Sequence, residues 1–294
     1  MLDYKTQNQT YLSYIERYME ENCFCNNSEP QAELFEAMRY SLLAGGKRLR
    51  PIFVFDFCRM TGGDWKSAAP FAAAIEMVHT YSLIHDDLPC MDNDDYRRGK
   101  LSNHKVYGEA MAMAILAGDA MLTSAFGHIA DAPALSADAK LRAVSYLSRC
   151  AGETGMVGGQ VLDILAEQRE CTEQEILNIQ NRKTGALIKA ACVLGVMAAN
   201  GTAEQEFAAM EFADHLGLAF QIRDDMLDVI GDADKLGKAT GMDGQKNTFV
   251  RLYGLEKCEE LVKEHTEAAI DALDVFEDSE FMRELALSLV GREM

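Results

Sequence analysis

The chain has 294 residues, of which 48% are hydrophobic and 5 are proline, so it can bury a sizeable core and is not expected to be disordered. Its 28 basic and 47 acidic residues give a formal net charge of −19, which argues against nucleic acid and anionic membrane surfaces as partners. The N-terminus lacks a signal pattern, and the longest uncharged stretch, residues 190–203, is shorter than the roughly 20 apolar residues that span a bilayer. We therefore expect a cytoplasmic protein with reduced cysteines and no membrane insertion.

Helical periodicity recurs along almost the whole chain, whereas the alternation typical of strands is nearly absent. The apolar pattern lacks internal repeats and linker-like segments, so we predict an all-α protein with a single domain over residues 1–294. The helices 68–88 and 173–199 are apolar around most of their circumference and should lie inside the bundle. The predicted helices cover residues 4–21, 31–43, 51–60, 68–88, 107–130, 138–152, 173–199, 204–230, 248–274 and 279–291.

A first acidic cluster follows the apolar run of the helix 68–88. Five aspartates fall within residues 86–95, and an arginine pair comes directly after them. A solvated acidic loop is the simplest interpretation of such a run, but carboxylates this close to a core need a positive partner. Magnesium bound by one or two carboxylates and by substrate phosphates would provide it. Pro89 cannot continue a helix and should bend the chain, so that Asp86 and Asp92 reach a common ion cluster.

A second acidic cluster lies inside the predicted helix 204–230. Gln221, Asp224, Asp225 and Asp228 are spaced i, i+3, i+4 and i+7, so their side chains share one helix face. Like charges at this spacing destabilise a helix, and natural sequences keep such a conflict mainly at functional sites. One DDxxD pattern is a weak signal, but two aspartate clusters, each ending an apolar helical stretch, indicate a metal site.

A basic segment, GGKRLRP, precedes the predicted helix 51–60. It places Lys47, Arg48 and Arg50 within four residues, next to glycines that allow close backbone approach. A solvated basic turn would have the same composition. The alternative is an anion site, because a helix start that could lie near Pro51 would add free N–H groups.

Taken together, these segments resemble one known family. GGKRLRP, HTYSLIHDDLPCMDNDDYRRG, GMVGGQVLD, RKTGALI, QIRDDMLD and LGKATG follow one another between residues of about 40 and 250, in the order of the trans-isoprenyl diphosphate synthase family. Within this family the sequence is most similar to bacterial farnesyl diphosphate synthases, also called geranyltranstransferases. The resemblance implies the isoprenoid synthase fold, with about ten or more helices around a deep central cavity, and a homodimer.

The resemblance also implies roles for individual residues. Three magnesium ions would be held with the substrate by the two aspartate motifs, Asp86, Asp87 and Asp92 in the first and Asp224, Asp225 and Asp228 in the second. The allylic diphosphate would contact Arg97, Lys183 and Lys238. The diphosphate of isopentenyl diphosphate would be held by Gly46, Lys47, Arg50, His79 and Arg98. The reaction centre would be lined by Thr184 and Gln221, with Asp163 supporting it. The stretch 241–247 is about two residues shorter than the family's loop, so Lys246 is given no role.

The expected activity is magnesium-assisted condensation of isopentenyl diphosphate with dimethylallyl or geranyl diphosphate to (2E,6E)-farnesyl diphosphate. Tyr81 and Ser82 precede Asp86 by five and four residues, where bulk would stop the growing chain, and an aromatic there is similar to enzymes that make the fifteen-carbon product. A geranylgeranyl diphosphate synthase is the alternative. A non-catalytic helical partner subunit would commonly lose one aspartate motif, and a terpene cyclase would not need the basic segment. The preferred starter and the kinetics do not follow from the sequence.

Overall fold

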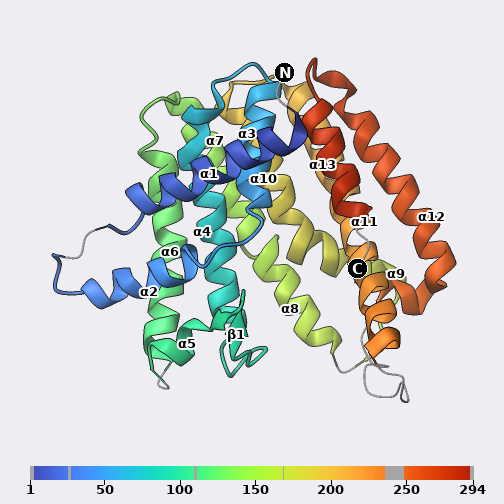
Figure 1. Ribbon diagram of the computed structural model, residues 1–294, viewed down its shortest axis with the longest axis horizontal. Coiled ribbons are helices and arrows are strands. Elements are labelled where there is room, and N and C mark those ends of the chain that lie inside the picture. The colour runs from blue at the N-terminus through green and yellow to red at the C-terminus, as the bar shows by residue number, and fades with distance from the viewer. Residues whose placement is uncertain (1–2, 26–27, 109–110, 168, 236–247, 292–294) are drawn as a thin grey trace. The chain divides into compact units, whose positions relative to one another are not determined.

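The computed structural model of the chain describes residues 3–25, 28–108, 111–167, 169–235 and 248–291, with only the backbone described for residues 231–235. Helices account for almost all regular structure, which confirms the all-α prediction (Figure 1). The chain forms two compact units, which are described separately. Unit 1 comprises Met1–Val144 and Met197–Asn200, and unit 2 comprises Ser145–Val196 and Gly201–Met294. A single domain over residues 1–294 stays a prediction.

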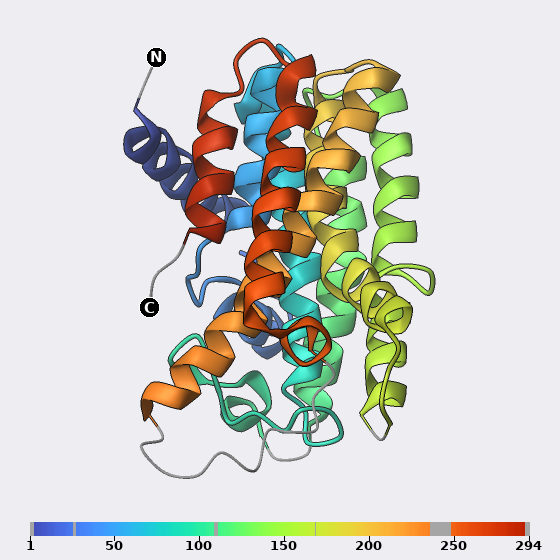
Figure 2. The same ribbon diagram turned by 90° about the vertical axis from the view of Figure 1, so that its right-hand side faces the viewer.

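Unit 1 is built around one buried helix. Helix α4 (Ala69–Asp86) has Pro70 in its first turn, where proline is tolerated, and its side chains from Ala69 to Val78 are all buried. It packs against α6 over much of its length, and the two helices lie side by side in both views (Figure 1 and Figure 2). The other elements are α1 (Tyr4–Asn22), α2 (Ala32–Leu42), α3 (Leu49–Met60), η1 (Trp65–Ala68), β1 (Tyr96–Arg97), β2 (Lys100–Leu101), α5 (Asn103–Val106) and α6 (Ala112–Ala130).

Unit 2 is built around the long helix α11 (Ala203–Lys235), which packs along α12 (Phe249–Ala272). Helix α9 begins with a capping box, in which Thr172 and Glu175 satisfy each other's backbone N–H groups. The other elements are α8 (Met156–Ala166), α9 (Glu173–Gln180), the π-helical segment η2 (Asn181–Gly185), η3 (Leu273–Val275) and α13 (Glu280–Val290). Helices α7 (Ala137–Ala151) and α10 (Ala186–Ala198) contribute residues to both units.

Three features differ from the predicted elements. The segment 156–166 is a helix that was not predicted, because glycines at positions 158 and 159 lower its helical propensity. The antiparallel hairpin of β1 and β2 was also missed, since strands of two residues cannot show alternation. The predicted helix 173–199 is interrupted by the wider turn at Asn181–Gly185, which contains Lys183 and Thr184. Such π segments often lie at functional sites.

Candidate active site

The first aspartate motif lies in a tight turn after α4. The helix ends at Asp86, and the chain then reverses so that the N–H of Asp92 donates to the backbone oxygen of Asp86 at 2.8 Å. The N–H of Asn93 closes the same turn on the oxygen of Leu88 at 3.1 Å. On a regular helix Asp86 and Asp92 would lie on roughly opposite faces. The bend expected at Pro89 is therefore present, and it places the backbones of these two aspartates side by side.

An arginine hairpin completes this motif. Its turn residues Arg98 and Gly99 have φ of 53° and 74°, positive at both positions as a type I′ turn requires. From β1, Arg97 donates through Nε to Oδ1 of Asp87 at 2.8 Å and through Nη2 to Oδ2 of Asp94 at 2.9 Å. Burial raises the pKa of the Asp87 carboxyl, and the contact with Arg97 offsets only part of this rise. A further positive charge beside Asp87 would therefore stabilise its ionised form.

The donor set fits magnesium. Carboxylate oxygens are the hard ligands that Mg²⁺ prefers, and Asp86 and Asp92 both remain accessible to solvent. Among the described residues, no group of three His, Cys, Asp or Glu side chains lies close enough to hold a metal ion. A magnesium ion at these aspartates would take one or two carboxylates from the protein and its remaining ligands from substrate phosphate and water.

A basic cluster lies in the same unit, at the start of α3. Lys47 is exposed, Arg48 is buried at the N-cap of α3, and Nε of Arg50 is buried without a hydrogen-bond partner among the described residues. Gly46 has a φ of 128°, and a Cβ there would lie 3.1 Å from Cζ of Arg98. The structure thus brings the predicted residues Arg50, His79 and Arg98 together around one concentration of positive charge, with Gly46 against Arg98. Lys47, also predicted, is exposed directly after Gly46 in the chain.

His79 is uncharged at neutral pH. Burial lowers its pKa to about 3, with the positive charges of Arg50, Arg98 and Arg48 acting in the same direction and Glu76 opposing them. A neutral imidazole has one N–H donor and one acceptor nitrogen. His79 can therefore donate one hydrogen bond to an anion without adding a charge to the cluster.

This pKa predicts how stability depends on pH. Between pH 6.5 and about 3 the unfolded chain protonates His79 and the folded chain does not, so the free energy of unfolding should fall as the pH decreases below 6.5. The loss is about 1.4 kcal/mol per pH unit well inside this window. Urea unfolding at pH 6, 5 and 4 should therefore show a shallower pH dependence for His79→Gln than for the wild type. Parallel curves would contradict the prediction.

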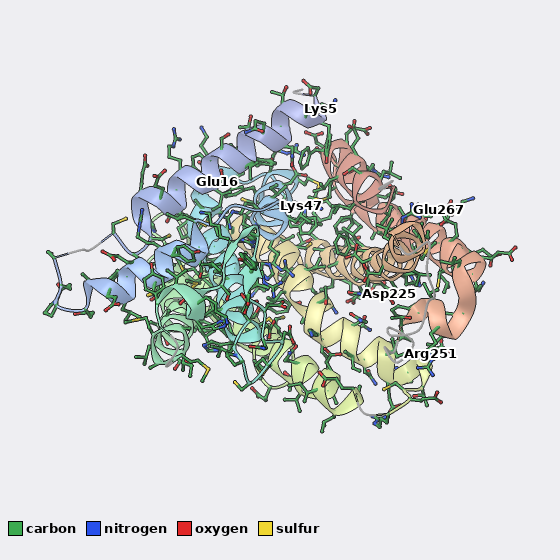
Figure 3. All side chains as sticks on the ribbon, turned by 60° about the horizontal axis from the view of Figure 1, so that its bottom comes forward. Lys5, Glu16, Lys47, Asp225, Arg251 and Glu267 are labelled. Carbon is green, nitrogen blue, oxygen red and sulfur yellow. The ribbon has the colours of Figure 1, made fainter. Side chains whose placement is uncertain are left out.

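The second aspartate motif lies on one face of α11, as predicted. Gln221 donates to Oδ1 of Asp225 at 3.1 Å, and the N–H of Phe249, the first residue of α12, donates to Oδ2 at 2.9 Å (Asp225 is labelled in Figure 3). Burial raises the pKa of Asp225, and these two hydrogen bonds lower it only in part. Asp225 therefore also ties α11 to the start of α12. Asp228 is exposed on the same face.

Lys183 is positioned by α8. Its Nζ lies 2.6 Å from Oδ2 of Asp163, so Asp163 contacts it directly. The backbones of α8 and η2 approach closely at Gly159, where a Cβ would lie 2.2 Å from the backbone nitrogen of Lys183. Gly159 of the GMVGGQVLD segment thus allows the π segment that contains Lys183 and Thr184 to lie close against α8.

Gly159→Ala should destabilise the protein by roughly 1–3 kcal/mol, because backbone must move to accept the methyl group. Gly217→Ala in α11 is the matched control, since its Cβ would meet Cδ1 of Ile188 at an ordinary 3.6 Å. The control should be neutral or raise stability by up to about 1 kcal/mol. The urea concentration at the midpoint of unfolding measures the stability of each variant. Equal losses of stability in the two variants would contradict the close approach at Gly159.

Comparison with known proteins decides the family. Residues 31–285 match the Polyprenyl synthetase family. The chain belongs to the polyprenyl synthetase family. It is 45% identical to farnesyl diphosphate synthase of Micrococcus luteus over 271 residues, which cover 91% of this chain and 90% of that one. It is also 44% identical over 264 residues to a chloroplastic heterodimeric geranylgeranyl pyrophosphate synthase large subunit of Arabidopsis thaliana. The matched region covers 87% of this chain and 71% of that one.

A solved structure of this polyprenyl synthetase type supports the fold. The crystal structure of an FPP/GFPP synthase from Zymomonas mobilis has a TM-score of 0.87 and 36% identity, and covers 98% of this chain and 99% of that one. The resemblance noted in the sequence is confirmed, and the chain is an enzyme, a trans-prenyltransferase. Farnesyl and geranylgeranyl synthases are similar to it at nearly equal identity, so identity alone does not separate the two products.

Several polar residues of this synthetase were not predicted from its sequence. Glu76, buried next to the basic cluster, was missed, although it and His79 interrupt an otherwise apolar helix, and that interruption is a usable signal. The contact of Asp94 with Arg97 joins residues only three apart, but it lies in a turn without helical or strand periodicity. The hydrogen bond of Phe249 to Asp225 joins segments 24 residues apart and has no local pattern. Lys238 lies outside the described residues.

Proposed function

We propose that this chain condenses isopentenyl diphosphate with dimethylallyl or geranyl diphosphate to give (2E,6E)-farnesyl diphosphate. Family membership supports the reaction class, and the family uses isopentenyl and allylic diphosphates. The observation that carries the proposal is Arg50, whose buried Nε has no partner within the described part of the chain. An arginine that is not hydrogen-bonded to a carboxylate among the described residues, beside Lys47, is suited to a second anion in addition to one held at the aspartate motif. A terpene cyclase would need only one diphosphate site.

The aspartates of both motifs are proposed as the magnesium ligands, with three ions in the substrate complex. Buried carboxylates such as Asp87 and Asp225 have raised pKa values because burial penalises their ionised form, and a divalent cation would offset this penalty. Bound Mg²⁺ would neutralise the negative charge that develops on the departing diphosphate. The proposed ligands are Asp86, Asp87, Asp92, Asp224, Asp225 and Asp228.

We propose that different residues of the chain bind the two substrates, line the reaction centre and exclude water. Arg97 and Lys183, together with Lys238, would hold the allylic diphosphate while its carbon–oxygen bond breaks and the electron pair leaves with the diphosphate. The basic cluster would hold isopentenyl diphosphate with its double bond toward the allylic carbon, and loss of a proton would complete the new double bond. Thr184 and Gln221 would line the reaction centre. The apolar surface of α4 would exclude water, which would otherwise quench the carbocation.

Tyr81 supports a fifteen-carbon product. Its side chain is 5% exposed on α4, one turn and a half before Asp86, and its ring stands edge-on to His85 with 5.7 Å between centroids. Ser82 adds little bulk, and its hydroxyl donates back to the oxygen of His79 at 2.9 Å. Tyr81 is therefore the bulky group at the position that we propose limits chain growth. A twenty-carbon product is the alternative.

Incubation with labelled isopentenyl diphosphate, each allylic starter and Mg²⁺, followed by chromatography of the dephosphorylated products, tests the proposal. We expect fifteen-carbon product from both starters and none after chelation of the metal. Incorporation into twenty-carbon product would favour a geranylgeranyl diphosphate synthase. No incorporation with any starter would contradict the proposed function.

We propose that the enzyme works in the cytoplasm as a homodimer that associates through α6. Among the described helices, α6 is long and apolar enough to cross a membrane, but core helices of soluble proteins are often equally long and apolar. One face of α6 is buried, while Ile115 and Leu116 are 41% and 55% exposed. Asp119 is also exposed, and a carboxylate in the middle of a bilayer would be costly. A second copy of this chain is therefore a better partner than a lipid bilayer for a helix face that has both apolar side chains and a carboxylate.

Light scattering coupled to gel filtration tests the assembly. The wild type should have twice the mass of one chain, and Leu116→Arg should shift it toward the mass of a single chain. Leu287→Arg, which changes an equally exposed leucine of α13, should leave the mass unchanged. A wild-type protein of single-chain mass would contradict the homodimer.

A further inference from the structure

Glu76 is a buried carboxylate whose burial needs an explanation. It lies in the middle of α4 and is 1% exposed, among alanines and other apolar residues. A carboxylate that is removed from water must be paired and hydrogen-bonded, and a buried ion pair is seldom the most stable choice for a core. The position of Glu76 one helical turn before His79 suggests that its role concerns the basic cluster.

One oxygen of Glu76 joins two separate segments of the chain. Its Oε1 accepts from Nη1 of Arg48 at 2.8 Å, and Nη2 of Arg98 lies 3.5 Å from the same atom. Arg48 comes from the N-cap of α3 and Arg98 from the turn of the hairpin β1–β2. Burial by itself would raise the pKa of Glu76, but the positive charges of Arg48 and Arg98 and the hydrogen bond from Arg48 act against burial and keep this pKa below its ordinary value. Glu76 is therefore ionised.

Both arginines have an unusual backbone conformation. The φ angles are 50° at Arg48 and 53° at Arg98, a region that residues other than glycine rarely adopt. Such conformations persist only where surrounding contacts hold them. Here the second guanidinium nitrogen of each arginine is also fixed, because Arg48 donates to the oxygen of Leu42 at 2.8 Å and Arg98 to the oxygen of Gly45 at 2.5 Å.

The two arginines of GGKRLRP are thus in different situations. Arg48 is 3% exposed and is engaged by Glu76 and Leu42, so little of it is left for a ligand. Arg50 is near enough to Glu76 to be attracted by its charge but makes no such hydrogen bond within the described part of the chain, and Lys47 is exposed. The cluster has more positive charges than the single negative charge of Glu76 can neutralise. It therefore still attracts an anion.

We propose that Glu76 and Arg48 are positioning residues that hold Arg98 and the start of α3 in place, so that Arg50, Lys47 and Arg98 present their charges to the diphosphate of isopentenyl diphosphate. This inference rests on the proposed function, which places that diphosphate at the basic cluster. Glu76 does not touch the substrate and acts through the two arginines. Loss of Glu76 should therefore weaken the binding of isopentenyl diphosphate and leave the binding of the allylic starter nearly unchanged.

Steady-state kinetics of Glu76→Gln, with each substrate varied in turn, test the proposal. We expect the KM for isopentenyl diphosphate to rise about 10- to 100-fold, the range of a lost charge-assisted contact, and the KM for the allylic starter to change less than about threefold. Glu16→Gln is the matched control, because Glu16 on α1 lies 3.8 Å from Nε of the same Arg48 but is half-exposed (Glu16 and Lys47 are labelled in Figure 3). It should leave both KM values unchanged. An unchanged isopentenyl diphosphate KM in Glu76→Gln would overturn the proposal.

A double variant separates positioning from stability. Glu76→Met with Arg48→Met replaces the ion pair by apolar side chains of similar length, which commonly preserves folding. Positioning predicts that this variant unfolds at the wild-type temperature but still has a raised KM for isopentenyl diphosphate. Recovery of the wild-type KM together with stability would show a structural role only and overturn the proposal.

Calorimetric titration of isopentenyl diphosphate into the free protein keeps the two hypotheses distinguishable. A wild type that binds isopentenyl diphosphate without turning it over would contradict the proposed function, and weaker binding to Glu76→Gln would still support positioning. Equal binding by the wild type and Glu76→Gln would contradict positioning, whatever the turnover.

Discussion

Asp86→Asn should lower kcat/KM by about 10²- to 10³-fold, the range seen when one preorganised group that stabilises developing charge is removed. The side chain keeps its size, and the backbone oxygen of residue 86, which closes the turn that follows, is unchanged. The melting temperature should therefore stay within a few degrees of the wild type. Initial rates over a range of Mg²⁺ concentrations measure the effect, and the variant should need more metal to reach its half-maximal rate.

Asp95→Asn is the matched control for this change. Asp95 belongs to the same acidic run, but its carboxylate pairs with Lys105 at 2.8 Å and is mostly exposed. An exposed pair of this kind contributes little to stability, and we give Asp95 no part in metal binding. The control should therefore keep the wild-type rate and metal requirement. Equal losses in the two variants would mean that the run acts only through its total charge.

Tyr81→Ala should lengthen the product from fifteen to at least twenty carbons. The ring is buried on α4 beside His85, which in turn approaches the backbone oxygen of Ile115 on α6 at 3.1 Å. Replacing the ring by a methyl group leaves a cavity along α4 in the direction in which we propose the chain grows. Burial raises the pKa of Tyr81 to about 12, so the ring is neutral and acts through its volume.

Tyr81→Phe and Ser82→Ala are the controls for product length. Phenylalanine keeps the volume of the ring and removes only the hydroxyl, so the product should remain at fifteen carbons. Ser82→Ala removes a hydroxyl that is bonded to the helix backbone and opens little space. Product chromatography that shows fifteen-carbon output from Tyr81→Ala would contradict the assignment of Tyr81.

Local periodicity was sufficient to predict most of the long helices, though not α8, and the shared face of Gln221, Asp225 and their neighbours. The conformational restriction of proline was also informative. Pro89 predicted the reversal of the chain that brings the backbone of Asp92 back to that of Asp86. The resemblance added the roles of residues such as Lys183, whose spacing has no meaning by itself. These signals are contained in short stretches of sequence.

Contacts that join distant segments could not be predicted in the same way. The hydrogen bond from Phe249 to Asp225 spans 24 residues, and the pairing of Arg48 with Glu76 spans 28. Neither has a local pattern that fixes its partner. The π segment at Asn181–Gly185 was missed because a single wide turn shifts the helical period too little to interrupt it. The part of the site that holds its functional groups in place was therefore the part that only the structure revealed.

The central claim is that aspartates of both motifs bind metal ions on one allylic diphosphate. Its most direct test is a crystal structure with a non-hydrolysable allylic diphosphate analogue and Mn²⁺, located by anomalous scattering. We expect manganese between the analogue's phosphates and the carboxylates of Asp86 and Asp92, and manganese on the same diphosphate bound by Asp224 or Asp228. Manganese at one motif alone, or analogue bound with no ion between it and these carboxylates, would contradict the claim.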